Sequence, residues 1–353
     1  METTVDGPKV TRAKRRTRIA LLAAPETSAS VLYGLYDVLL SVGAVFPDMT
    51  VGTAGDALLD VFIVAATAEP FRCFGNVLVE PALAVDDAED VDVVIICDMY
   101  APIGEAPKGK YPVETAWLRR VHERGAVIAT VCTGSVLLAE SGLLDGRVCT
   151  SHWAYGSLFR EAYPQVRFRP EKVLELAHEA DRLITGGGVT AWQDLALYVI
   201  ARYCSPADAA ETMKVYLINR HDEGQLPYAA MTHIVRGNDA AVGRAVAWIG
   251  DHYAVGNPVS AMAEVAGLLP RTFARRFAAS TGRRPIEHVH ALRVETAGRL
   301  LEEGASAVDD VGYEVGYEDP AFFRRLFRRS TGLTPAAYRR KYAAVTAAPE
   351  KAP

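Results

Sequence analysis

The feature that most constrains this 353-residue chain is a short pattern that occurs twice near its C-terminal end. The identical residues share one offset of 50 positions: Phe273/Phe323, Phe277/Phe327, Ser280-Thr281-Gly282/Ser330-Thr331-Gly332 and Pro285/Pro335. Two tandem copies of one supersecondary unit are the simplest account of such a repeat.

Each copy reads as a helix-turn-helix unit. In the first copy, residues 259–266 have helical apolar periodicity, Gly267 suits the turn, and Pro270 suits the first position of a second helix. Phe273 and Phe277 are four residues apart, so both can enter a core from one face of that helix. In the second copy, Asp319 fits an N-cap directly before Pro320.

The faces opposite the phenylalanine pairs are rich in arginine, and guanidinium groups suit phosphate oxygens and guanine edges. The residues expected to bind DNA are Arg271, Thr272, Ala274, Arg275 and Arg276 in the first helix, and Pro320, Ala321, Phe322, Arg324, Arg325 and Arg328 in the second. One such helix is as consistent with an ordinary solvated face as with a DNA contact. Two in register favour double-stranded DNA as the partner.

The formal charge of −5 fits a DNA-binding protein only when it is divided along the chain. Residues 239–341 carry 15 basic and 12 acidic side chains, a balance of +3, while residues 1–238 carry −8. An acidic unit is therefore joined to an arginine-rich one, whose DNA affinity should depend on salt.

Compartment and membrane signals favour a cytoplasmic protein. The five cysteines are scattered without a Cys-x-x-Cys pair, which favours reduced thiols over a disulfide framework or a metal site. Residues 1–17 read as a flexible basic tail, and 342–353 as a second flexible tail. The apolar run 19–24 suits a buried strand better than a signal peptide, and no run is long enough to span a membrane.

Between residues 18 and 204, apolar strand-like runs alternate with helical patterns. This order predicts an α/β unit, a flavodoxin-like doubly wound parallel sheet with helices on both faces, followed by an all-α unit. The expected strands are 19–24, 62–66, 91–97, 127–131 and 183–185; the expected helices are 29–42, 113–124, 135–141 and 191–203, with an excursion at 48–60.

The chemically interesting turn is Val131-Cys132-Thr133, where a strand ends and a helix begins at once. Helix amides that point back at the thiol predict an exposed cysteine with a lowered pKa. This turn resembles the nucleophile elbow of the class I glutamine-amidotransferase-like superfamily, in its PfpI branch. His152 follows Cys132 at the spacing of that branch, and residues 183–188 match its late glycine-rich turn. The resemblance covers roughly residues 18–203.

Two departures from the PfpI pattern argue against an enzyme. The acidic position of the relatives falls on Val31, and Cys97-Asp98-Met99 replaces the Gly-Gly pair that forms an oxyanion hole. Cys132 and His152 are then candidates for vestigial or redox residues. Three functions of this unit remain open: a non-catalytic ligand site, a thiol redox sensor, and a cysteine-dependent amidase or deglycase. The residues expected to bind a ligand are Cys132, Thr133, His152, Trp153, Asp98, Met99 and Tyr100; neither a cofactor nor a metal is expected.

Residues 239–341 resemble the DNA-binding domain of AraC/XylS-type regulators, with paired recognition helices and a long connecting helix at 285–303. The expected buried stripe of that helix is Ile286, Val289, Leu292, Ala297, Leu300 and Leu301. By this resemblance, bases are read by Arg271, Ala274 and Arg275, and by Pro320, Ala321 and Arg325.

The whole chain resembles the GlxA subfamily of AraC regulators. It has a PfpI-like unit (18–204), a helical linker (205–238) and an AraC-type DNA-binding domain (239–341). The linker comprises an expected helix at 207–220 and a polar connector. The resemblance implies a ligand-responsive transcription regulator, an activator by expectation, working with RNA polymerase. It also implies a small nitrogenous metabolite as effector and a homodimer.

Overall fold

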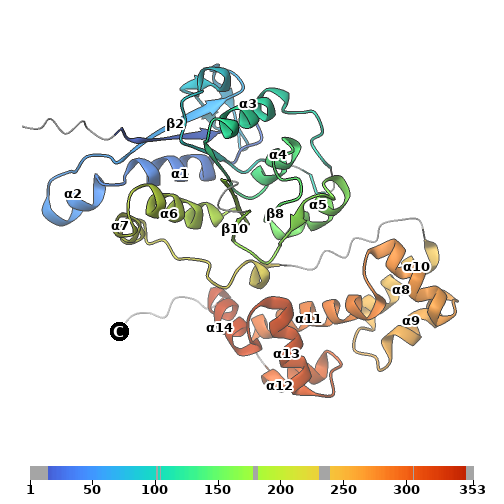
Figure 1. Ribbon diagram of the computed structural model, residues 1–353. Helices are drawn as coiled ribbons and strands as arrows, with labels where there is room; N and C mark the ends of the chain where they lie inside the picture. The colour runs from blue at the N-terminus through green and yellow to red at the C-terminus, as the bar shows by residue number, and fades with distance from the viewer. Residues whose placement is uncertain are drawn as a thin grey trace, which may run out of the picture. The chain divides into compact units, whose positions relative to one another are not determined.

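The computed structural model describes residues 15–100, 102–103, 105–177, 182–229, 239–304 and 306–346 (Figure 1). The chain divides into two compact units, residues 1–221 and 222–353. The predicted linker is shared between them, because α7 (Pro206–Tyr216) belongs to the first unit and residues 222–229 belong to the second. Residues 230–238 and most of both predicted tails lie outside the described residues.

The first unit is built on a seven-stranded sheet in the order β10-β11-β7-β6-β1-β2-β5. All pairs are parallel except β10 with β11. The strands are β1 (Thr17–Leu22), β2 (Leu59–Ala65), β5 (Leu83–Ala84), β6 (Val93–Ile96), β7 (Val127–Thr130), β10 (Leu174–Leu176) and β11 (Leu183–Gly186). Two small separate sheets pair β3 (Phe71–Arg72) with β4 (Leu78–Val79), and β8 (Val148–Cys149) with β9 (Arg167–Phe168).

Helices cover both faces of this sheet, as the alternation of patterns predicts. Along β1, Ile19 and Leu21 enter one core with α1 (Ala29–Leu40) and α6 (Ala191–Tyr203). Ala20 and Leu22 enter the other, with α3 (Pro112–Glu123), α4 (Gly134–Glu140) and α5 (Gly156–Ala162). Strands buried on both faces explain the continuous apolar runs of the sequence, and the doubly wound fold is confirmed.

Two local differences from the predicted elements have simple causes. The excursion after α1 contains a short helix, α2 (Val45–Val51), which ends at Gly52 in the left-handed region (φ 73°). Helix α7 stops at Tyr216 because Leu217 adopts a left-handed conformation (φ 53°).

Of the described helices, none is by itself long and apolar enough to span a membrane; α1 and α2 reach the required length and composition only together, with a 59° bend.

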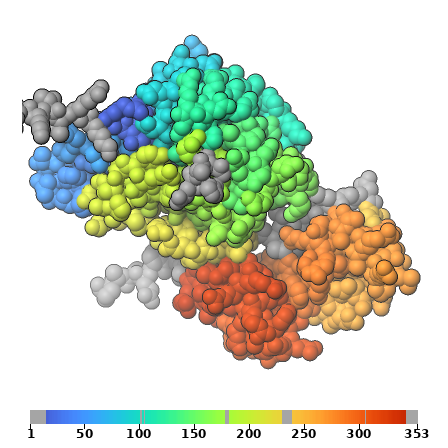
Figure 2. Space-filling view, viewed as in Figure 1, coloured from blue at the N-terminus to red at the C-terminus, as the bar shows by residue number. Residues whose placement is uncertain are grey.

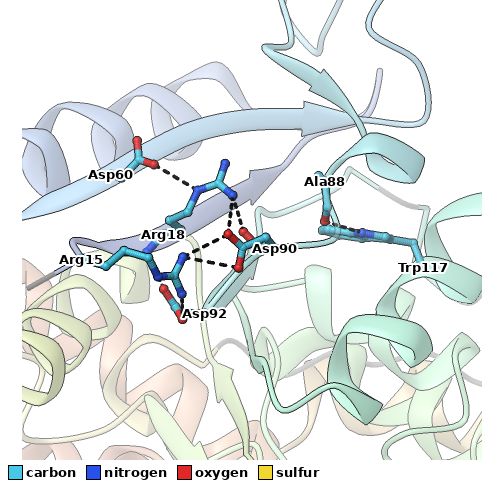
Figure 3. A network of polar contacts seen from close by, with 7 residues as sticks. All are labelled: Arg15, Arg18, Asp60, Ala88, Asp90, Asp92 and Trp117. Atoms are coloured by element: carbon cyan, nitrogen blue, oxygen red, sulfur yellow. Dashed lines mark hydrogen bonds and ion pairs between the residues drawn. The ribbon is translucent and has the colours of Figure 1, made fainter.

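A polar network fixes the beginning of β1 to the loop before β6 (Figure 3). Arg15 pairs with Asp90 and Asp92, and Arg18 pairs with Asp60 and Asp90. These side chains are mostly exposed, so each ion pair contributes little to stability.

The second unit is entirely helical and holds two small cores, one for each helix-turn-helix unit. Its helices are α8 (Ala240–Asp251), α9 (Pro258–Ala266), α10 (Pro270–Thr281), α11 (Pro285–Glu303), α12 (Val308–Glu314), α13 (Pro320–Thr331) and α14 (Pro335–Thr346). All four repeated phenylalanines are fully buried, as predicted. The carboxylate of Asp319 accepts the Ala321 amide at 2.8 Å, which confirms the expected N-cap.

The long helix α11 joins the two cores and has the predicted bounds. Its stripe is confirmed at Val289, Ala297 and Leu301, but Ile286 is 37% exposed because it lies in the first turn, ahead of both cores. The sequence did not reveal a second link. The buried guanidinium of Arg293 donates to the carbonyls of Tyr253 (2.7 Å) and Val255 (2.9 Å) and to that of Gly316 (2.7 Å). One side chain thus holds the loop after α8 and the turn after α12 together.

Candidate functional site

The candidate ligand cleft lies where the strand order of the sheet reverses. The chain passes from β1 to β2 and later returns on the other side of β1 with β6, so the loops after β1 and β6 diverge at this edge. Ser28 donates a hydrogen bond to Oδ2 of Asp98 at 2.6 Å. Oδ1 of Asp98 is buried without a hydrogen-bond partner among the described residues. Burial raises the pKa of Asp98, although the hydrogen bonds from Ser28 oppose the shift.

Cys132 occupies the tight turn between β7 and α4 that the sequence predicts. Its φ of 52° lies in the left-handed region, which costs a non-glycine residue about 1–2 kcal/mol. The hydroxyls of Ser135 and Ser151 both donate to its carbonyl at 2.8 Å and hold this conformation. Gly134 is required next to it, because a Cβ there would lie 2.6 Å from the Ile96 carbonyl oxygen.

The thiol of Cys132 corrects the expectation of an exposed, acidic cysteine. The residue is only 4% exposed. Burial, together with the neighbouring Asp98 carboxyl, raises the pKa of Cys132 to about 12, even though Thr133 and the backbone amide of His152 hydrogen-bond to the sulfur. Desolvation of the charged form outweighs the helix amides, so the group is a neutral thiol at pH 7.

Thr133 contacts Met99, which lies in the loop where the PfpI pattern has the Gly-Gly pair of an oxyanion hole. Its hydroxyl accepts the Met99 amide at 2.9 Å and donates to the Met99 carbonyl at 2.5 Å. Both residues are buried. The Met99 N–H is therefore already used, and it is not directed at an incoming oxyanion.

His152 and Trp153 lie side by side where the 3-10 helix η2 (Trp153–Tyr155) begins, with ring centroids 4.9 Å apart. Nδ1 of His152 accepts the Ala154 amide at 3.2 Å, and burial lowers the pKa of this imidazole. The described contact between His152 and Cys132 is made by the histidine's backbone amide. The predicted proximity is present, but an imidazole–thiol pair is not among the described contacts.

A pocket of about 140 Å³ opens at the same edge, and three predicted ligand-binding residues line it: Met99, Tyr100 and Thr133. Lys110 and Tyr111 also line it, and sequence reasoning missed both because they lie on the long loop before α3. Their partner is Glu26, which binds Lys110 Nζ at 2.5 Å and the Tyr111 hydroxyl at 3.0 Å. The available signal was Glu26 itself, an acidic residue four positions after the end of β1.

The remaining predicted ligand residues lie outside this pocket. Asp98, Cys132, His152 and Trp153 are not part of its lining, so the predicted set is divided into two neighbouring groups. Tyr100 connects the pocket to solvent, since its ring is 60% exposed and stacks on Phe74 at 5.2 Å. Phe74 lies between β3 and β4 and was not predicted as a site residue.

The first recognition helix, α10, presents its arginines to solvent. Arg271 and Arg275 are exposed and form no hydrogen bond or ion pair among the described residues. Thr272 and Ala274 lie half-buried beside them. Arg276 corrects one expectation: it donates to both carboxylate oxygens of Asp239, at 2.7 and 2.8 Å, and so links α10 to the N-cap of α8. Its side chain has a structural partner in place of DNA.

The second recognition helix, α13, exposes most of its predicted residues, but acidic partners accompany its arginines. Ala321, Phe322, Arg324, Arg325 and Arg328 are exposed, and Pro320 is half-buried. Arg324 binds Asp309 of α12 at 2.7 Å, and Arg325 lies 4.0 Å from Asp319. Phe322 packs its ring 5.8 Å from that of Tyr317. Two of the predicted DNA contacts therefore compete with ion pairs inside the unit.

The fold and these surfaces define a two-part protein, an elbow-bearing α/β unit followed by tandem helix-turn-helix units. Residues 18–202 match the DJ-1/PfpI family and residues 262–341 match a helix-turn-helix domain. The chain belongs to the DJ-1/PfpI family, and the GlxA-type resemblance seen in its sequence is confirmed.

Three known proteins illustrate the similarity. The chain is 26% identical to the HTH-type transcriptional regulator CdhR of Pseudomonas aeruginosa, over 78% of this chain and 80% of that protein. It is 29% identical to the HTH-type transcriptional regulator GlxA of Rhizobium meliloti, over 64% and 68%. It is also 28% identical to the isonitrile hydratase of Pseudomonas putida, over 57% and 77%. The chain is thus similar both to proteins named as regulators and to one named as an enzyme.

Proposed function

We propose that this protein is a sequence-specific, DNA-binding transcription regulator whose DJ-1/PfpI unit binds a small effector. The observation that carries the proposal is the pair of helix-turn-helix units in register. Both bury the same phenylalanine pair and both direct arginines outward. The relatives named as regulators, CdhR and GlxA, extend over both units and support this assignment.

The effector site of the proposal is the edge of the sheet around Asp98 and Tyr100. A buried carboxyl oxygen without a partner is costly, so an N–H donor or a cation that reaches Oδ1 of Asp98 would gain free energy. The stacked rings of Phe74 and Tyr100, and that of Trp153, offer aromatic faces for such a cation. These features favour a small nitrogenous metabolite, bound with contributions from Cys132, Thr133, His152 and Met99.

An enzymatic function is the second candidate, because the strained turn at Cys132 and the isonitrile hydratase relative favour it. Three properties oppose it: the neutral thiol, the occupied Met99 amide, and a valine at the acidic position of the PfpI pattern. We infer that the α/β unit senses and does not catalyse. Turnover of a substrate that is lost in Cys132→Ala would overturn this inference.

The raised pKa of Cys132 allows a pH-dependent test of whether the α/β unit is a sensor or an enzyme. Because the folded-state pKa is about 12, the reactive thiolate fraction should rise tenfold per pH unit from pH 7 to 10 without reaching a plateau. Mass spectrometry of iodoacetamide-treated native protein would measure this rate at Cys132. A plateau below pH 8 would instead indicate an activated thiolate, as an enzyme or a thiol redox sensor requires.

The principal experiment is a titration of the full chain against its own upstream DNA and unrelated fragments, with a panel of amino acids and quaternary amines. The proposal expects a preference among fragments that one metabolite alters. Binding without preference under every effector condition would contradict it. By the same proposal the protein is a homodimeric activator that contacts RNA polymerase in the cytoplasm, which a reporter assay and a sedimentation measurement would check.

A further inference from the structure

The segment Glu223–Tyr228, which we call the connector segment, packs on the second helix-turn-helix unit. The Tyr342 hydroxyl donates to the Pro227 carbonyl at 2.7 Å. Lys341 Nζ binds a carboxylate oxygen of Glu223 at 3.1 Å and lies 4.6 Å from the centre of the Tyr228 ring. In Figures 1 and 2 this yellow stretch abuts the red α14.

The connector segment also covers the end of the second recognition helix. Gly332, in the left-handed region (φ 76°), terminates α13, and a Cβ built on it would lie 3.5 Å from the Glu223 carbonyl oxygen and from Pro227. Gln225 and Pro227 of this segment are buried. The contacts fall on the C-terminal ends of α13 and α14, so they leave the exposed N-terminal half of α13 open for DNA.

This placement is not what chain order suggests. Residues 222–229 precede α8, the first helix of the first helix-turn-helix unit, in the chain, yet Glu223, Pro227 and Tyr228 contact α14 and the end of α13. Pro227, Tyr228 and Ala229 also form one wall of a pocket of about 720 Å³ beside α11. The contacts with Lys341 are made by two exposed residues of the connector segment, Glu223 and Tyr228, so water reaches them, which suits a contact that can open.

We propose that the surface formed by Gly332, Lys341 and Tyr342 receives the connector segment and thereby makes the second helix-turn-helix unit the one that responds to the DJ-1/PfpI unit. This inference rests on the proposed function. Docking stabilises the C-terminal ends of α13 and α14 and favours the DNA-reading conformation of α13. Release of the segment weakens reading by α13 and leaves reading by α10 unchanged.

The test uses the full chain and a DNA fragment that the wild type binds selectively. Arg275→Ala and Arg325→Ala first identify the base pairs read by α10 and by α13. The release variant is Lys341→Met with Tyr342→Phe, and Glu223→Gln weakens the same contact from the connector side. Tyr313→Phe, on the exposed face of α12, is the matched control. Hydrogen exchange at the Tyr228 amide, which donates to the Gln225 carbonyl, reports whether the segment is docked.

In the wild type and the control, replacing one base pair should cost about thirtyfold in affinity where α10 reads it and about tenfold where α13 reads it. In the release variants, the Tyr228 amide should exchange faster, and the loss at the α13 position should shrink to about threefold while the loss at the α10 position stays near thirtyfold. A loss at the α13 position that is the same in the release variants as in the wild type, or an unprotected Tyr228 amide in the wild type, would overturn the inference. A wild type without any sequence preference would instead refute the proposed function itself.

Discussion

The two helix-turn-helix units share one scaffold but present different chemistry on it. In α10 and α13 the repeated phenylalanines are buried to the same degree, and both helices end at a glycine in the left-handed region. On the outer faces, Arg271 and Arg275 of α10 have no described partner, whereas Arg324 binds Asp309 and Arg325 lies near Asp319. The core of the repeat is thus maintained while the reading surface diverges.

The difference indicates unequal contributions to DNA binding. A carboxylate beside an arginine competes with phosphate for it and repels the DNA backbone. At the equivalent base-reading position, the first unit offers the unpaired guanidinium of Arg275, whereas Arg325 of the second lies beside Asp319 and must leave it to contact DNA. We therefore expect α10 to supply most of the affinity and α13 to supply a smaller, adjustable part.

The largest expected effect comes from removing Arg293, which links the two helix-turn-helix units. Arg293→Met leaves the carbonyls of Tyr253, Val255 and Gly316 without their donor, which should lower the free energy of unfolding of the helical unit by about 3 kcal/mol or more. Urea unfolding, with hydrogen exchange of the α11 amides as the readout, would measure this loss of stability. Arg299→Met, an exposed position on the same helix, is the control; equal effects in both variants would refute the bridging role.

The next effect compares the reading arginines directly. Arg275→Ala should weaken binding to the preferred fragment by about 1–3 kcal/mol and relax its base preference, because a free guanidinium suits a guanine edge. Arg325→Ala, at the equivalent position, should cost less. Titrations of both variants at one salt concentration decide the order. A larger loss for Arg325→Ala would reverse the comparison.

A smaller change should make the second helix resemble the first. Asp319→Asn retains a side chain that can cap α13, removes a negative charge near DNA and releases Arg325. We expect affinity to rise about twofold to fivefold, with a steeper dependence on salt. Unchanged affinity at low salt would show that Asp319 does not restrain the second unit.

The smallest effect concerns Arg276, which the sequence alone assigns to DNA. Because its guanidinium binds both oxygens of Asp239, Arg276→Met should loosen the start of α8 and leave base preference unchanged. The same titration, together with hydrogen exchange at the Ala241 amide, separates the two roles. A lost base preference with normal protection of that amide would restore the original assignment.

The parts that the sequence predicts are those encoded by local periodicity. The offset of 50 positions predicts both helix-turn-helix units, and the spacing of Phe273 and Phe277 predicts their buried face. The apolar runs predict the doubly wound sheet, and the motif around Cys132 predicts the tight turn. Each of these depends on residues a few positions apart, so the pattern is visible before folding.

The parts that the sequence misses depend on residues brought together by the fold. Burial by the surrounding elements raises the Cys132 pKa most, and the charge of the Asp98 carboxyl raises it further; no local pattern reveals either cause. The pairing of Arg276 with Asp239 spans 37 positions, and that of Tyr342 with Pro227 spans 115. Arg293 looks like any polar residue on an amphipathic helix until its three carbonyl acceptors are known.

The most direct test of the central claim is protection of guanine N7 from dimethyl sulfate on the preferred fragment, with wild-type protein. Two helix-turn-helix units of unequal strength predict two protected major-groove segments, and one of them should lose protection first as salt rises. Arg275→Ala should abolish protection in the more stable segment. A single protected segment, or uniform weak protection along the fragment, would contradict two tandem reading units.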